Sequence, residues 1–205
     1  LSLKWKHVVN NNLYGVFTGG YSHYGYSISS DINPTEAFNM KFSIQQTNAK
    51  VDFSYFPNQK HTINFGLGTI HYKLAPGNMQ PEGSESLVAP NELEDEQGLE
   101  SSIYIGENFE LSQNISLYAG VRYSYYQFLG PKDVYIYSPG VSREESSIAD
   151  TVRYGSGKSI ATHHGFEPRF SIRYSLSRSA SIKFSYNTMR QYIQMLSNTT
   201  AIAPT

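Results

Sequence analysis

The sequence predicts an all-β fold: an antiparallel, up-and-down transmembrane β-barrel segment of about eight strands. Three observations predict it. Apolar residues recur at every second position in eight stretches, helical spacing is nowhere convincing, and the connections alternate between short and long. In ISLYAGVRYSYYQFL, residues 115–129, Leu117 and Val121 share one parity, whereas Arg122 and Ser124 share the other.

Period-2 alternation places the strands, in chain order, at residues 1–9, 13–30, 37–56, 61–74, 99–111, 115–128, 165–176 and 180–194. A strand that crosses a bilayer needs about 9 to 11 tilted residues, whereas strands in soluble proteins most often have about 5 or 6. Several of the predicted strands exceed both lengths. Their length favours a barrel whose strands project beyond the membrane.

Short and long connections alternate along the chain. The short turns lie at residues 10–12, 57–60, 112–114 and 177–179, and the longer connections lie at 31–36, 75–98 and 129–164. Outer-membrane barrels have short periplasmic turns and long extracellular loops. We therefore expect residues 1–205 to be part of one barrel domain, with 75–98 and 129–164 as extracellular loops.

The predicted strand 37–56 contains an irregularity. Its apolar residues keep even parity up to Ile44 and odd parity from Val51 onward. A one-residue slip of this kind predicts a bulge or a tight turn at residues 46–49. A turn there would raise the count to nine strands and break the rhythm of short and long connections.

Charged residues in the predicted strands share the parity opposite to the apolar rows. A Lys or Arg that faces lipid near the bilayer midplane costs about 2–4 kcal/mol. We therefore expect five polar side chains to face a wet lumen: Arg122, Glu167, Arg169, Arg173 and Lys183. The same parity would also suit a soluble sheet with one solvated face.

Aromatic residues are abundant, with 17 Tyr and 11 Phe against one Trp. Aromatic residues near strand ends form girdles at both interfaces of membrane barrels; in a soluble sheet they would be ordinary cross-strand pairs. The girdle prediction comprises Tyr55, Phe56, Tyr72, Tyr125, Tyr126, Phe128 and Tyr192. Because long loops carry function on barrels, Tyr135, Tyr137, Arg143 and Arg153 are predicted to contact a ligand.

Composition argues against several functions. The net charge of −1 gives no basic surface for nucleic acid, and the chain has no cysteine for a disulfide, a thiolate or a Cys-based zinc site. The mean hydropathy of −0.43 and the absence of long apolar runs exclude membrane-spanning helices. We expect no enzymatic activity, since no catalytic constellation stands on a defined element, and no cofactor or metal, apart from calcium as a minor option at the acidic stretch 91–100.

Three stretches together resemble the barrel portion of TonB-dependent receptors: VDFSYFPNQKHTINFGLGTIHYKLAPG (51–77), SSIYIGENFELSQNISLYAGVRYS (101–124), and the run from HHGFEPRFSIRYSLS to SYNTMRQYIQMLSN within 163–205. The branch they resemble carries a carboxypeptidase-regulatory-like extension before the plug. The resemblance implies a wall section of an outer-membrane barrel of about 22 strands in a Gram-negative bacterium. It also implies energy-coupled import of a scarce nutrient.

The resemblance further implies several partners: the lipid bilayer, the remaining barrel and plug, an inner-membrane energy-coupling protein, and a possible lid lipoprotein. Sugar oligomers, metal chelates, peptides and cobalamin-like molecules are all compatible with a polar lumen. The alternative function is a non-transport outer-membrane barrel or an adhesin-like surface protein. A secreted β-sandwich with a sugar-binding face is a third possibility.

Overall fold

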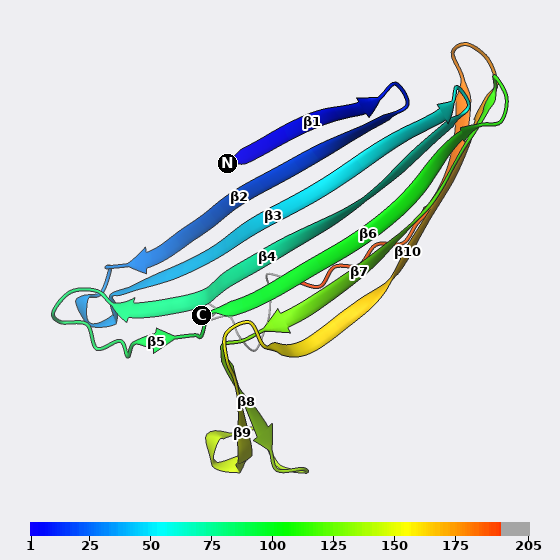
Figure 1. The fold of residues 1–205 in the computed structure, drawn as a ribbon. Helices are drawn as coiled ribbons and strands as arrows, with labels where there is room; N and C mark the ends of the chain where they lie inside the picture. The colour runs from blue at the N-terminus through cyan, green and yellow to red at the C-terminus, as the bar shows by residue number, and fades with distance from the viewer. Residues whose placement is uncertain (194–205) are drawn as a thin grey trace.

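The computed structural model describes residues 1–193, and most of them lie in antiparallel strands (Figure 1). Eight long strands form the main sheet in the order β1-β2-β3-β4-β6-β7-β10-β11. Their bounds are β1 Ser2–Asn10, β2 Leu13–Ser30, β3 Phe38–Asn58, β4 His61–Pro81, β6 Glu96–Glu110, β7 Ile115–Leu129, β10 Ser159–Ser175 and β11 Ser181–Asn187. Each of these strands pairs with its neighbour in the chain, as the up-and-down prediction requires.

Three short strands and two short helices complete the described elements. Strand β5 (Asn91–Glu92) pairs with β4, and β8 (Lys132–Tyr137) pairs with β9 (Ile148–Tyr154) in a separate hairpin. The helices are single 3-10 turns, η1 (Pro34–Glu36) and η2 (Glu145–Ser147). Within residues 1–193, no helix has the length and apolar character needed to cross a membrane.

The four short turns lie together at one end of the sheet (Figure 1). Polar side chains close them locally: Asn10 Oδ1 accepts from the Asn12 backbone N at 2.9 Å, and Asn58 Oδ1 accepts from the Lys60 backbone N at 2.9 Å. Asn side chains favour turns because they can replace backbone hydrogen-bond partners in this way. The residues that predicted these turns therefore also close them.

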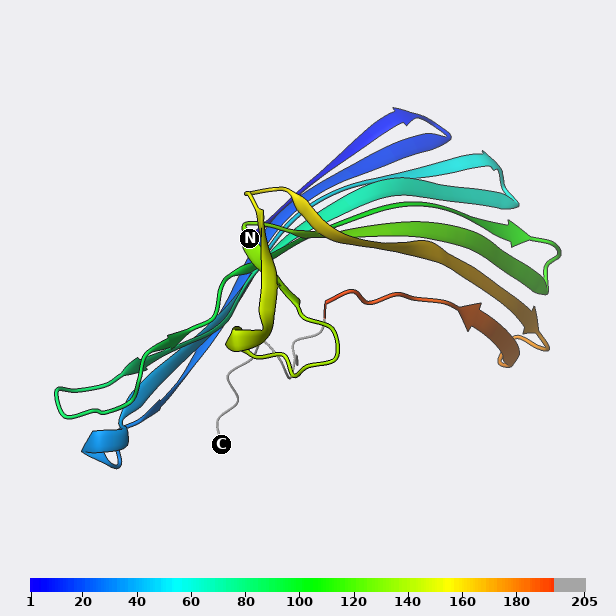
Figure 2. The same ribbon diagram turned by 90° about the horizontal axis from the view of Figure 1, so that it is seen from below.

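The main sheet is curved and open, with β1 and β11 as its edges in the described part of the chain (Figure 2). We call the face that carries Ser124 and Glu167 the concave face, because residues 188–193 lie inside the curve and contact it. The convex face carries Ile105 and Phe166, which are exposed. Side chains on one strand alternate between these faces, and directly paired residues share a face.

The predicted bulge or turn at residues 46–49 is wrong. Strand β3 is continuous there, and its register with β2 runs without a shift from Phe38 opposite Ser30 to Tyr55 opposite Leu13. Its apolar residues change face instead. Near the short turns the apolar residues lie on the convex face, and toward the far end they lie on the concave face. In the sequence, such a change of face looks the same as a one-residue slip in register, because both move the apolar residues from even to odd positions.

The two long connections contain more strand than expected. Strand β4 continues to Pro81 and β6 begins at Glu96, which shortens the connection predicted at 75–98. The connection predicted at 129–164 contains the β8–β9 hairpin and the start of β10. The last predicted strand also differs: β11 ends at Asn187 rather than 194, and residue 194 lies outside the described part.

Candidate functional site: the concave face of the sheet

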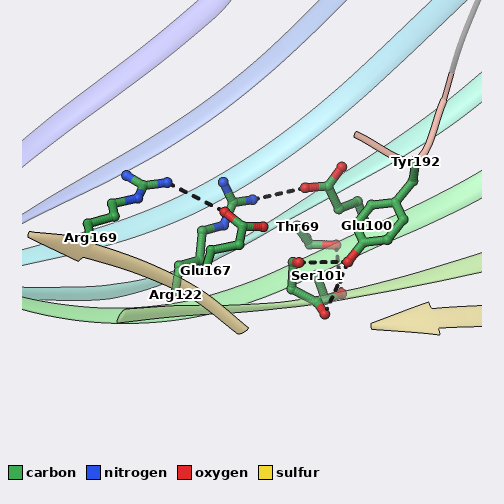
Figure 3. A network of polar contacts seen from close by, with 8 residues as sticks. Thr69, Glu100, Ser101, Arg122, Glu167, Arg169 and Tyr192 are labelled. Atoms are coloured by element: carbon green, nitrogen blue, oxygen red, sulfur yellow. Dashed lines mark hydrogen bonds and ion pairs between the residues drawn. The ribbon is translucent and has the colours of Figure 1, made fainter. Parts of the chain in front are cut away.

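A group of ion pairs lies on the concave face, across β6, β7 and β10 (Figure 3). Arg122 Nη2 donates to Glu100 Oε1 at 2.9 Å, and Arg169 Nη2 lies 3.5 Å from Glu167 Oε2. Arg122 and Glu167 are also direct cross-strand partners. The register therefore brings together three of the five side chains that the sequence predicted for a lumen.

The other two predicted residues, Arg173 and Lys183, share the concave face and lie opposite each other near the short turns. Both are exposed. Two like charges in direct cross-strand register disfavour the pairing unless water or an anion screens them. This end of the concave face therefore requires a wet environment.

Among the side chains of these ion pairs, Glu167 is the most buried, since its side chain is 2 % exposed. The Nε atoms of Arg122 and Arg169 are also buried, and each has no hydrogen-bond partner among the described residues. A buried donor without a partner costs about 1–3 kcal/mol. The ion-pair group is therefore an incompletely satisfied polar network within this part of the chain.

Beside the ion pairs is a hollow of about 310 Å³ lined mainly by polar side chains. Gly68 contributes no side chain to it, so the hollow stays open above β4. On its far side, Lys50 Nζ lies 2.9 Å from Asp52 Oδ1, and the Tyr104 hydroxyl donates to the same carboxylate. The concave face thus has space and matched charges in the same region.

Tyrosine rings cover glycines on this face. A Cβ at Gly98 would meet Tyr126 Oη at 2.5 Å, and a Cβ at Gly106 would meet Tyr118 Oη at 2.5 Å. The glycines let the rings lie flat against the neighbouring strand, an arrangement that stabilises strand glycines. Sequence reasoning missed these pairs, because the signal is the register between strands and not a pattern within one strand.

Residues 188–193, which we call the inner strap, leave β11 and cross the concave face. The Tyr192 ring stacks on Tyr126 with centroids 5.3 Å apart and an interplanar angle of 7°. The Tyr192 side chain is shown in Figure 3, and its hydroxyl lies 2.7 Å from Ser124 Oγ. Arg190 lies over Gly165, where a Cβ would overlap its guanidinium. The inner strap therefore buries Ser124 completely.

The seven aromatic residues predicted for a girdle do not share one face. Tyr55 and Tyr125 are on the convex face, but the other five are on or against the concave face and do not belong to an outward girdle: Phe56, Tyr72, Tyr126, Phe128 and Tyr192. The prediction was wrong for these five because nearness to a strand end does not determine the face.

A convex aromatic row that the sequence reasoning missed crosses β1 to β4. Trp5 stacks on Phe17 at 5.1 Å, Phe17 meets Phe53 edge-on at 6.3 Å, and Phe53 stacks on Phe65 at 5.3 Å. Aromatic cross-strand pairs stabilise a sheet by about 0.2–1 kcal/mol each. The signal that would have found them is parity combined with the cross-strand register.

The four predicted ligand contacts, Tyr135, Tyr137, Arg143 and Arg153, lie in and beside the β8–β9 hairpin. The Arg143 guanidinium lies over the Tyr137 ring at 5.9 Å, and Arg153 Nε lies 3.3 Å from Asp133 Oδ2. Tyr135 is half exposed. These contacts stabilise the hairpin itself, and a role in ligand binding stays a prediction.

Two acids of the stretch 91–100 pair with lysines. Asp95 Oδ2 lies 2.8 Å from Lys73 Nζ, and Glu96 Oε1 lies 2.7 Å from Lys132 Nζ. Within residues 1–193 no three His, Asp or Glu side chains are grouped as metal ligands would be. Calcium binding in this stretch stays a prediction.

The sheet is curved and antiparallel, and near the short turns it has a polar concave face and an apolar convex face; this is the form of a wall section of a β-barrel. The chain belongs to the TonB-dependent receptor-like β-barrel family, whose model matches residues 1–205. This membership confirms the resemblance found in the sequence. No curated protein matches the chain.

A solved structure shares the fold, and a second was also matched. The ferric-catecholate import receptor Fiu from E. coli K12 in its open form is 12% identical, covers 93% of this chain and 35% of its own, and has a TM-score of 0.52. The FrpB iron transporter from Neisseria meningitidis is 11% identical over 85% of this chain and 29% of its own, with a TM-score of 0.41. The chain therefore spans about a third of the length of these structures.

Proposed function

We propose that this chain is a section of the wall of an outer-membrane TonB-dependent receptor that imports a scarce nutrient. The observation that supports this proposal most directly is the difference in chemistry between the two faces of the sheet. Exposed apolar side chains, such as Ile105 and Phe166, cover the convex face near the short turns, and the ion pairs around Glu167 occupy the concave face. In such a barrel lipid covers the first face and water the second.

The convex face supports lipid contact in a second way. It contains a hollow of about 520 Å³ with a lining that is almost entirely apolar, formed by residues such as Phe53, Leu67, Ile103, Val121 and Phe166. A soluble protein rarely exposes so continuous an apolar surface. Lipid chains would fill this hollow without any polar partner.

The concave face supports the presence of a plug. The Nε atoms of Arg122 and Arg169 have no hydrogen-bond partner within residues 1–193, and together with the open hollow beside Lys50 they leave donors and space for a further polypeptide. In this proposal the plug and the remaining strands complete the lumen. An inner-membrane energy-coupling protein acts on the plug, and a lid lipoprotein is a further possible partner.

The placement of the two faces is tested in lipid vesicles with the full-length receptor, after any cysteine outside residues 1–205 has been replaced. A fluorophore attached at Ile103→Cys on the convex face should be quenched by brominated lipid. The same fluorophore at the neighbouring Ser102→Cys, on the concave face, should be quenched only by a water-soluble reagent. Equal lipid quenching at both positions would refute the proposed placement.

Import is tested by deleting the gene in the source bacterium and growing the mutant on panels of limiting nutrients. The expected result is a defect for one nutrient that the wild-type receptor restores only when the energy-coupling protein is intact. A mutant that grows normally on every panel but no longer attaches to a surface would favour the adhesin-like alternative.

A further inference from the structure

A group of exposed and half-buried aromatic and aliphatic side chains lies on the concave face, at the end of the sheet away from the short turns. We call it the aromatic platform and define it by Tyr24 and Tyr26 of β2, Phe42 and Ile44 of β3, and Leu74 of β4. The register places them together: Tyr24 is opposite Ile44, Tyr26 is opposite Phe42, and Ile44 is opposite Leu74.

The rings of the platform are ordered against each other, and both tyrosines are still exposed. Tyr26 stacks on Phe42 with centroids 4.7 Å apart and an interplanar angle of 12°, and Tyr24 lies 6.2 Å from Tyr26. Tyr24 is 60% exposed and Tyr26 is 42% exposed. An exposed group of large apolar side chains usually marks a binding surface.

The opposite face of the same strands is polar, which excludes a membrane explanation for the platform. Between the platform residues, the side chains that point to the convex face include His23, Ser27, Lys41 and Gln45. Lipid does not accommodate such a row. This section of the sheet therefore meets water on its convex side, and the apolar side chains point toward the lumen.

The platform carries no charge. Its concave neighbours on β2 and β3 in the described structure are hydroxyl, amide and apolar side chains: Ser22, Ile28, Ser30, Phe38, Met40 and Gln46. Glu96, which lies opposite Leu74, pairs with Lys132 at 2.7 Å. An anionic ligand would require an unpaired Arg or Lys, the side chains that recognise carboxylates and phosphates.

We propose that the aromatic platform binds a neutral oligosaccharide. A sugar ring has an apolar face that fits against aromatic rings, and its hydroxyls match uncharged donors and acceptors such as Ser22, Gln46 and the tyrosine hydroxyls. This inference deepens the import function proposed above and rests on it, since it names the class of nutrient.

The platform is tested with the purified full-length receptor in detergent. Short neutral oligosaccharides from starch, xylan and mannan are the probes, and ferric citrate is the anionic probe; binding is measured by calorimetry. We expect at least one neutral oligosaccharide to bind and ferric citrate not to bind. Binding of ferric citrate alone, or of none of the probes, would overturn the proposal.

Variants locate the binding to the platform. Tyr26→Ala and Phe42→Leu should each weaken oligosaccharide binding about two- to tenfold, because each variant loses one stacking ring. The matched control is Tyr21→Ala, a tyrosine on the convex face of the same strand, which should bind as the wild type does. Unchanged affinity in both platform variants, or an equal loss in the control, would contradict the inference.

Two further readouts separate this inference from the import function. Heat-modifiable gel migration shows whether each variant has folded, and Phe42→Leu retains apolar volume where an alanine would leave a gap. Oligosaccharide binding without energy-dependent uptake would refute import and leave the platform standing. Energy-dependent uptake that Tyr26→Ala does not impair would refute the platform and leave import standing.

Discussion

Phe166 and Glu167 are consecutive residues of β10 with opposite surroundings: the Phe166 side chain is 65% exposed on the convex face, and Glu167 is 2% exposed on the concave face. In a protein surrounded by water alone this arrangement would be reversed, because burial in the protein stabilises an apolar side chain and contact with water stabilises a carboxylate. Lipid on the convex side explains the exposure of Phe166, and ion-pair partners on the concave side explain the burial of Glu167. Family membership agrees with that interpretation.

Lysine substitution at matched positions tests this difference between the faces. Ile103→Lys should destabilise the full-length receptor in lipid by about 2–4 kcal/mol, since the charge would face hydrocarbon. Ser102→Lys on the same strand should cost less than about 1 kcal/mol, because the polar hollow beside Glu100 has room for the side chain. Denaturant-induced unfolding in lipid vesicles measures both. Similar losses at the two positions would contradict the assignment of the faces.

Parity predicted the main sheet well, because each strand near the short turns has two faces of different chemistry. The alternation placed all eight long strands, and it separated Phe166 from Glu167 without any structure. The positions of the turns followed from local residues such as Asn10 and Asn58, whose side chains close them. Local chemistry and period-2 patterning act within a few residues, so a single sequence contains them.

The errors in prediction have a shared physical origin, since they depend on the surroundings of a strand and not on its own pattern. The apolar residues of β3 change face between Ile44 and Val51 because the surroundings of the strand change. From the even and odd positions alone, this change cannot be told from a one-residue slip in register. Tyr126 was assigned to a girdle by its nearness to a strand end, but cross-strand register directs its ring onto Gly98. The alternation of apolar and polar residues along one strand does not show which residues of the neighbouring strand lie opposite it.

Neutralising Glu167 should destabilise the receptor. Glu167→Gln leaves the Arg169 guanidinium without its carboxylate in a mostly buried position, and because that guanidinium is 34% exposed we expect a loss of about 1–3 kcal/mol. Asp133→Asn, which removes the acid from the exposed pair with Arg153, should cost less than about 1 kcal/mol. Chemical denaturation in detergent compares them, and a Glu167→Gln receptor as stable as wild type would show that the ion pair is dispensable.

The glycines of β2 and β4 should differ in their tolerance of a methyl group. In Gly66→Ala the new Cβ would overlap the Val51 carbonyl oxygen, which is backbone and cannot turn away, so a loss of about 1–3 kcal/mol is expected. In Gly19→Ala the Cβ meets no atom of residues 1–193 within 4 Å, and stability should change by less than about 0.5 kcal/mol. The temperature of the heat-modifiable gel shift measures each variant. A Gly19→Ala receptor that is the less stable of the two would refute this packing argument.

Tyr192 should hold the inner strap on the concave face through two separable contacts. Tyr192→Phe keeps the ring on Tyr126 but removes the hydrogen bond to Ser124 Oγ, which should cost about 1 kcal/mol. Tyr192→Ala removes both contacts and exposes Ser124. Its loss of stability should therefore exceed that of Tyr192→Phe by about 0.5–1.5 kcal/mol or more. Hydrogen exchange of residues 188–193 in the full-length receptor reports the opening of the strap, with Tyr174→Phe on the convex face of β10 as the control. We expect exchange to increase in the order wild type, Phe variant, Ala variant; exchange that is equally fast in all three would show that Tyr192 does not anchor the strap.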